Sequence, residues 1–274
     1  MKTALTIAGF DPSAGAGVTA DLMVFAAHGL HGIAAITALT VQSTLGVRAS
    51  HAVDPEILRT TLECLDQDIR PSGLKIGMVS SQANLRVISG YLKIFKFQHS
   101  DEERIPIVLD PVLMSSSGRE LLDPEGFAGL KESLLPLVDW VTPNTDELSR
   151  LTGLGVGSHQ DLAIAARQLQ GQVGRRIGVF AKGGHLENPD DLLLMPNGEE
   201  HWLAGERIET NSTHGTGCAL SSAFLSRLVL GDDPLEAAHR AKDYVASAMR
   251  KAPGVGNGKG PLGLLWPLSG QQRG

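Results

Sequence analysis

A polar, glycine-rich loop runs directly into a helix-forming stretch of small and apolar residues, with the sequence NSTHGTGCALSSAF over residues 211–224. The start of a helix leaves backbone N–H groups without partners and carries the positive end of the helix dipole. Gly215 and Gly217 have no Cβ, so an anion can approach the main chain closely. Cys218 stands at the start of the helix, where the same field favours a thiolate. A reactive acid–base group beside an anion site predicts phosphoryl transfer.

The pattern of apolar stretches predicts strands alternating with helices. We expect strands over 5–8, 33–41, 73–78, 105–109, 138–142 and 177–181, and a short β-rich stretch over 192–208. We expect helices over 18–28, 55–68, 82–97, 217–230 and 234–249, another from about residue 146, and a surface connection over 98–104. This alternation is typical of an α/β fold, a doubly wound, mostly parallel sheet with helices on both faces. We expect one domain over residues 1–274.

Four polar side chains fall at or just beyond the carboxyl ends of predicted strands, namely Asp11, Asp110, Asn144 and Lys182. In open α/β sheets, ligands bind outside the carboxyl ends of the strands. We therefore expect these side chains to border one binding site.

Composition limits the function classes. The chain has 274 residues, of which 42% are hydrophobic and 20% are charged, and its formal net charge is -6. An acidic chain is not expected to bind nucleic acid. No apolar run reaches the roughly 18 residues that span a bilayer, and the first residues lack a signal-peptide pattern, so a cytoplasmic protein without membrane contact is expected. Two cysteines, Cys64 and Cys218, cannot build a disulfide framework or a zinc site by themselves.

A dinucleotide-binding fold is the first alternative, because residues 15–20 read GAGVTA, close to the relaxed fingerprint. That fold places an acidic residue about 20 positions further on, for the ribose. Residues 22–53 contain no Asp or Glu, which argues against an NAD-binding protein.

A family resemblance runs through the whole chain in order. It is carried by the segments TIAGFDPSAGAG (6–17), ADL (20–22), ITALT (36–40) with Gln42 and Thr44, KIGM (75–78), LDPV (109–112), TPN (142–144), EL (147–148), KGGH (182–185) and residues 211–222. Together these resemble the hydroxymethylpyrimidine/phosphomethylpyrimidine kinases of thiamine biosynthesis. The resemblance implies a ribokinase-like fold and ATP-dependent phosphorylation of 4-amino-5-hydroxymethyl-2-methylpyrimidine, and then of its monophosphate to the diphosphate. It also implies a homodimer.

The resemblance also implies roles for residues. The backbone of Gly215, Thr216 and Gly217 would stabilise the transferring phosphoryl group, and Cys218 would be the catalytic base. Asp110 and Glu147 would organise Mg²⁺. Lys182, Lys242 and Asn144 would belong to the ATP site. The substrate site would comprise Gly9, Asp21, Gln42, Met78 and Val112. A Walker loop is not expected, because Gly258 and Lys259 are followed by Gly260.

Two other functions stay open. A pyridoxine/pyridoxal kinase on the same scaffold also acts on a flat heteroaromatic hydroxymethyl compound, although Asp21 with Gln42 favours an aminopyrimidine. A ligand-binding sensor would keep the pocket without a base. The chain departs from the family pattern at Phe10, Ala14 and Ser43, of which Phe10 lies beside the substrate loop.

Overall fold

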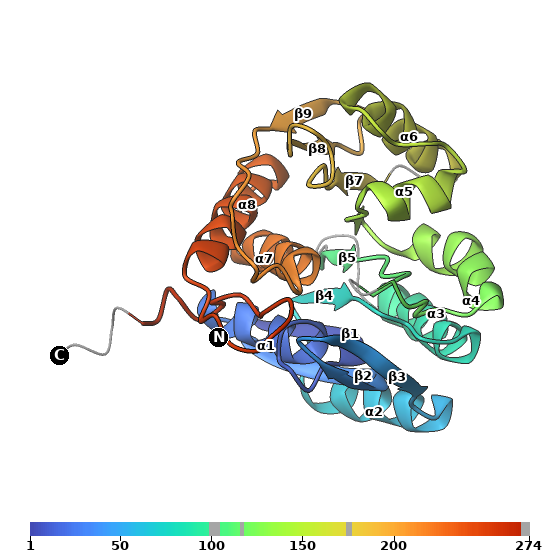
Figure 1. Ribbon diagram of the computed structural model, residues 1–274. Coiled ribbons are helices and arrows are strands. Elements are labelled where there is room, and N and C mark those ends of the chain that lie inside the picture. Colours follow the sequence, from blue (N-terminus) through green and yellow to red (C-terminus); the bar gives the residue numbers. More distant parts are fainter. Residues whose placement is uncertain (99–104, 116–117, 174–176, 270–274) are drawn as a thin grey trace.

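The computed structural model describes residues 1–98, 105–115, 118–173 and 177–269. Nine strands among them form one sheet in the order β3-β2-β1-β4-β5-β6-β7-β8-β9 (Figure 1). They are β1 (Thr3–Phe10), β2 (His31–Ser43), β3 (Gly46–Ala52), β4 (Gly73–Ile76), β5 (Ile107–Leu109), β6 (Trp140–Val141), β7 (Gly178–Ala181), β8 (Asp191–Leu194) and β9 (Glu200–Leu203). The six central strands pair in parallel, and β3, β8 and β9 pair antiparallel at the edges. The predicted mostly parallel sheet is confirmed.

Helices cover both faces of the sheet. Figure 1 shows α1 (Gly17–Ala27), α7 (Thr216–Leu230) and α8 (Pro234–Arg250) on one face. The other face carries α2 (Pro55–Asp68), α3 (Gln82–Gln98), α4 (Pro124–Gly129), α5 (Thr145–Thr152) and α6 (His159–Gln172). A π-helical turn (Leu130–Leu134) and a 3-10 turn (Leu135–Leu137) continue α4.

The central strands are buried on both faces, so their side chains alternate between two apolar cores. In β5, Ile107 and Leu109 join the core under α2, α3, α5 and α6, while Val108 joins the core with α1, α7 and α8. This period of two is what a strand dictates, and it explains why these strands read as continuous apolar runs.

Most helices begin with a side chain that caps the free backbone N–H groups. The caps of α2, α4, α5, α6 and α8 are Asp54, Asp123, Asn144, Ser158 and Asp233, respectively. Helices α1 and α7 begin after Ala16 and Gly215 and have no side-chain cap. Their first N–H groups are therefore left for another partner.

The structure differs from the predicted elements in four places. Helix α4 and the two turns that follow it, over 124–137, were not predicted. Strand β3 was not predicted, because its residues are only partly buried and lack a clear alternation. The helix expected from residue 146 is two helices, since Gly153 ends α5 with a φ of 79° and Ser158 caps α6. Gln98 ends α3, and the rest of the expected 98–104 connection lies outside the described residues.

Candidate active site

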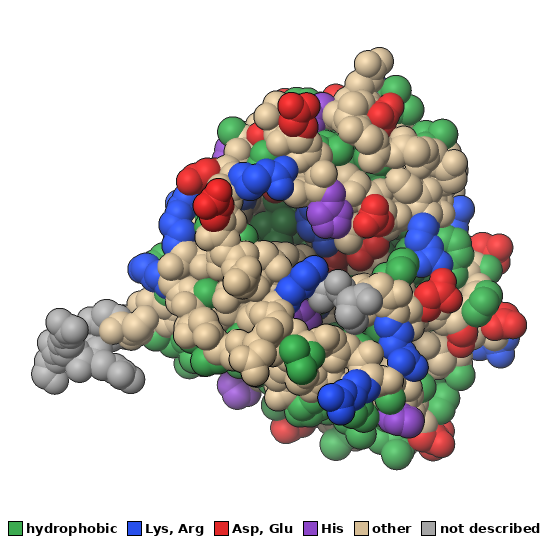
Figure 2. Space-filling model, viewed as in Figure 1, with side chains coloured by type: hydrophobic (Ala, Val, Ile, Leu, Met, Phe, Trp, Pro, Cys, Tyr) green, Lys and Arg blue, Asp and Glu red, His purple; other side chains and the backbone are tan. Residues whose placement is uncertain are grey.

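A cavity of about 490 Å³ opens at the carboxyl ends of the parallel strands. Figure 2 shows the hollow, bordered by acidic, basic and histidine side chains. The side chains predicted from the strand ends, Asp11, Asp110, Asn144 and Lys182, all line it. So do these other predicted site residues: Gly9, Gln42, Met78, Val112, Glu147, Gly215, Thr216, Gly217 and Cys218.

The loop before α7 forms the floor of the cavity. Gly215 has a left-handed φ of 81°, and a Cβ there would lie 1.8 Å from the carbonyl oxygen of Gly15. Both the left-handed φ and the lack of space for a Cβ therefore exclude any residue other than glycine at position 215. Helix α7 has no side-chain cap, so no capping side chain accepts a hydrogen bond from the backbone N–H groups of Thr216, Gly217 and Cys218 at its start. This is the geometry of an anion site.

A half-buried lysine lies over this loop. Lys182 Nζ would be 2.9 Å from a Cβ on Gly217. It donates a hydrogen bond to Asp110 Oδ1 at 2.9 Å and lies 3.8 Å from Glu147 Oε2. Burial opposes the charge on Asp110, but Lys182 and Lys75 hold the pKa of this carboxyl below its usual value. One cation thus faces two carboxylates at the edge of the anion site.

Glu147 is fixed by the start of α5. Its Oε2 accepts from the backbone N–H of Asn144, and the Asn144 side chain accepts from the N–H of Glu147, each at 2.8 Å. This reciprocal capping box orients the carboxylate toward the cavity. Burial and the neighbouring charge of Asp110 raise the pKa of Glu147 to about 7 despite Lys182. The negative charges of Asp110 and Glu147 are therefore not fully balanced by Lys182, which is the situation in a site that binds a cation.

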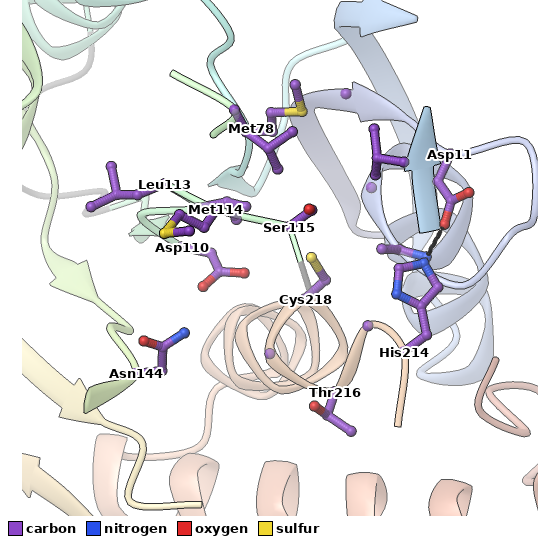
Figure 3. A pocket seen from close by; sticks show the side chains of 18 of the residues that line it. Asp11, Met78, Asp110, Leu113, Met114, Ser115, Asn144, His214, Thr216 and Cys218 are labelled. Atoms are coloured by element: carbon purple, nitrogen blue, oxygen red, sulfur yellow. Dashed lines mark hydrogen bonds and ion pairs between the residues drawn. The ribbon is translucent and has the colours of Figure 1, made fainter. Parts of the chain in front are cut away.

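Cys218 points into the cavity beside Asp110 (Figure 3). Burial raises the pKa of the Cys218 thiol to about 12, and the charges of Asp110 and Asp21 add to the effect against the opposing charge of Lys75. The expected thiolate is therefore wrong, because desolvation and nearby carboxylates outweigh the helix dipole.

An apolar wall faces the anion site. Met78 packs with Ala38, Leu121 and Val112 in a small cluster of its own. A Cβ on Gly9 would lie 2.9 Å from the Met78 sulfur, so glycine lets the Met78 side chain approach the strand end. A flat, apolar ring fits between such a wall and the start of a helix.

Two predicted site residues do not reach the cavity. Asp21 is fully buried in α1, where it accepts hydrogen bonds from Lys75, Thr6 and Ser222. All its acceptor positions face protein donors, so the structure does not support the expectation that it contacts substrate. Lys242 of α8 donates to Asp191 Oδ2 at 2.5 Å and to the carbonyl of Pro189. It lies behind the Lys182–Gly183 turn, whose Gly183 N–H donates to the same Asp191.

Lys75 and His214 are among the cavity-lining residues to which sequence reasoning gave no role. Lys75 is wholly buried in β4, and a charged residue within an apolar strand was a usable signal. His214 precedes the anion loop and contacts Asp11 at 2.7 Å. Its sequence neighbours did not reveal this partner, which lies 203 residues away.

Two wider features are plain in the described residues. Within the described ranges, no three His, Cys, Asp or Glu side chains are grouped to hold a metal ion. None of the helices described there is both long and apolar enough to cross a membrane.

An uncapped helix start, a lysine above it and a thiol beside it are suited to moving a charged group onto a small molecule. The parallel sheet offers this site at its carboxyl edge, where such folds bind ligands. Fold and cavity together define a small-molecule kinase of the ribokinase-like class.

The family model for phosphomethylpyrimidine kinase matches residues 11–263. The hydroxymethylpyrimidine/phosphomethylpyrimidine kinase of Staphylococcus aureus strain Mu50 is 37% identical over 264 residues, 95% of this chain and 92% of that protein. The chain belongs to the phosphomethylpyrimidine kinase family.

Solved structures agree with this assignment. The crystal structure of phosphomethylpyrimidine kinase from Clostridium difficile 630 is 36% identical, with a TM-score of 0.77 over 90% of this chain and 99% of that one. A pyridoxal kinase from Staphylococcus aureus, in complex with AMP-PCP and pyridoxal, is 28% identical, with a TM-score of 0.83 over 97% and 94% of the two chains.

Proposed function

We propose that this kinase transfers phosphoryl groups from ATP to 4-amino-5-hydroxymethyl-2-methylpyrimidine and then to its monophosphate, giving the diphosphate for thiamine biosynthesis. The observation that carries the proposal is the placement of Cys218 at the uncapped start of α7, opposite the apolar wall of Met78 and Val112. Family membership supports the same activity.

The residues of the chain divide the reaction between them. The N–H groups at the start of α7 and the ammonium of Lys182 receive the charge of the transferring phosphoryl group. The substrate hydroxyl loses its proton to Cys218 Sγ as its oxygen attacks phosphorus. Because the resting residue is a thiol, it first loses its own hydrogen to solvent water, a loss that the positive charge of Lys75 favours. Base catalysis of this kind contributes about 10²–10⁴-fold.

Asp110 and Glu147 are the residues that would hold Mg²⁺. Two buried carboxylates with only Lys182 between them fit an ion that keeps several water ligands. When bound, the ion neutralises the phosphate oxygens of ATP. Support for ATP itself comes from the AMP-PCP complex of the related pyridoxal kinase.

Pyridoxal is the second candidate substrate, because a structural neighbour binds it. The experiment is ADP release with ATP and Mg²⁺, with hydroxymethylpyrimidine, its monophosphate and pyridoxal offered separately. We expect two ADP per hydroxymethylpyrimidine and a much lower kcat/KM for pyridoxal. A preference for pyridoxal would contradict the proposal and make Phe10, which lines the cavity, the first residue to exchange.

The homodimer and the cytoplasmic location stay predictions. The β2 side chains Leu39 and Val41 are both 51% exposed, which suits a surface that a second copy covers. Sedimentation velocity at micromolar concentration tests the dimer.

A further inference from the structure

A histidine just before the anion loop links two walls of the cavity. His214 is buried, and a Cβ on Gly15 would lie 2.1 Å from its ring, so the N-terminal loop closes directly over it. Its Nε2 is 2.7 Å from Asp11 Oδ2 (Figure 3), and the side-chain amide of Gln42 lies 2.9 Å from the same nitrogen. One ring nitrogen therefore meets both a carboxylate and the substrate-facing amide.

The partners of Asp11 decide which atom holds the hydrogen. Its carboxylate accepts from the N–H and hydroxyl of Ser13 and from the N–H of Ala16, and its Oδ2 lies 2.7 Å from His214 Nε2. Although burial alone would raise it, the pKa of Asp11 is held below its usual value by His214 and Ser13. An ionised carboxylate has no hydrogen to give. The Nε2 of His214 must therefore be a donor, and it has no lone pair for a second donor.

This conclusion fixes the direction of the Gln42 amide. With the amide nitrogen toward His214, two N–H groups would face each other. The Thr40 hydroxyl would also have to give its single hydrogen to both Phe10 O, at 2.9 Å, and Gln42 Oε1, at 3.2 Å. Exchanging the two ends of the amide removes the N–H to N–H contact, because Gln42 Oε1 then shares the His214 Nε2–H with Asp11 Oδ2 and the NH₂ group donates to Thr40.

The amide so oriented has one N–H left. Thr40 takes one hydrogen of the NH₂ group, and Gln42 lines the cavity. We propose that His214, held by Asp11, is a positioning residue that fixes Gln42 with its N–H toward the substrate, so that the site requires a ring nitrogen acceptor. The inference rests on the proposed function, since the substrate class it selects is a nitrogen heteroaromatic alcohol.

Neutron diffraction from a deuterium-exchanged crystal of the wild-type protein tests the hydrogen positions directly. We expect deuterium on His214 Nε2 and both Gln42 deuterons on the end that faces Thr40. Deuterons on the end that faces His214 would overturn the inference. This measurement holds whatever the protein phosphorylates, so its failure is distinct from a failure of the proposed function, which inactivity of the wild type toward the pyrimidine would show.

Kinetics test the consequence for substrate. His214→Phe keeps the ring volume and removes the donor, so the KM for the pyrimidine should rise about tenfold, the contribution of one neutral hydrogen bond. The KM for ATP should change less than about twofold. On a Gln42→Ala background the same substitution should add nothing, and His214→Gln, which keeps a donor, should recover part of the loss.

A matched control is His28→Phe, since His28 is a partly buried histidine that contacts backbone outside the cavity. It should leave both KM values unchanged. A tenfold effect of His214→Phe that persists on the Gln42→Ala background, or an equal effect on both substrates, would overturn the positioning role.

Discussion

Lys75 Nζ and Asp21 Oδ2 lie 2.8 Å apart, and neither side chain is exposed to solvent. The carboxylate also accepts from Thr6 and Ser222, each at 2.6 Å. Ser222 is one helical turn beyond Cys218, so this buried pair lies directly behind the proposed catalytic residue. It joins α1, β4 and α7 at the centre of the molecule.

Breaking this pair should destabilise the protein strongly. Lys75→Met leaves a buried carboxylate without its cation, which typically costs about 3–5 kcal/mol. The double variant Asp21→Asn/Lys75→Met should be less destabilised than the sum of the single changes, because neither charge remains. Urea denaturation gives the free energies of unfolding of the two single variants and the double variant. If Asp21 instead contacts substrate, Asp21→Asn would raise the pyrimidine KM with little loss of stability.

The glycines of the anion loop should be essential for turnover. Gly215→Ala places a Cβ against Gly15 O, and Gly217→Ala places one against Lys182 Nζ. Each change displaces N–H donors from the transferring group, and we expect kcat to fall about 10²–10³-fold.

The control for these variants is Gly29→Ala. Gly29 also has a positive φ, of 74°, but no neighbouring atom lies within 4 Å of an added Cβ. It should lose a little stability and keep its kcat. Equal losses of kcat in all three variants would point to general strain and not to the anion site.

The two cysteines should differ in reactivity. The raised pKa of Cys218 leaves few thiolates at neutral pH, whereas Cys64 is exposed. In EDTA, alkylation of Cys218 in a Cys64→Ser background should be slow at pH 7 and rise about tenfold per pH unit as the solution approaches the thiol pKa. Mass spectrometry follows the adduct. Rapid labelling of Cys218 at pH 7 would show that the resting residue is a thiolate.

The strand-end rule predicted much of the site from sequence. Asp11, Asp110, Asn144 and Lys182 border one cavity because parallel strands share a carboxyl edge. The positions of Asp21 and Lys242 could not be predicted this way. Each faces a partner on another element, Lys75 and Asp191, and only the packing of helices on the sheet brings these charges together.

The fold shows the same division. Buried strands such as β5 were predicted because both their faces are apolar. Strand β3 escaped prediction because it is held mainly by pairing with β2, and its own residues are largely exposed or half-buried. The local sequence pattern indicates which strands are buried. The pairing of an edge strand depends instead on the strand beside it.

The most direct test compares wild type and Cys218→Ala by ³¹P NMR, with ATP, Mg²⁺ and hydroxymethylpyrimidine, and measures ATP binding alongside. We expect the wild type to form the pyrimidine diphosphate with two ADP released. Cys218→Ala should bind ATP normally and lose most of its turnover, about 10²-fold or more. No phosphorylated pyrimidine from the wild type, or wild-type turnover in Cys218→Ala, would contradict the account.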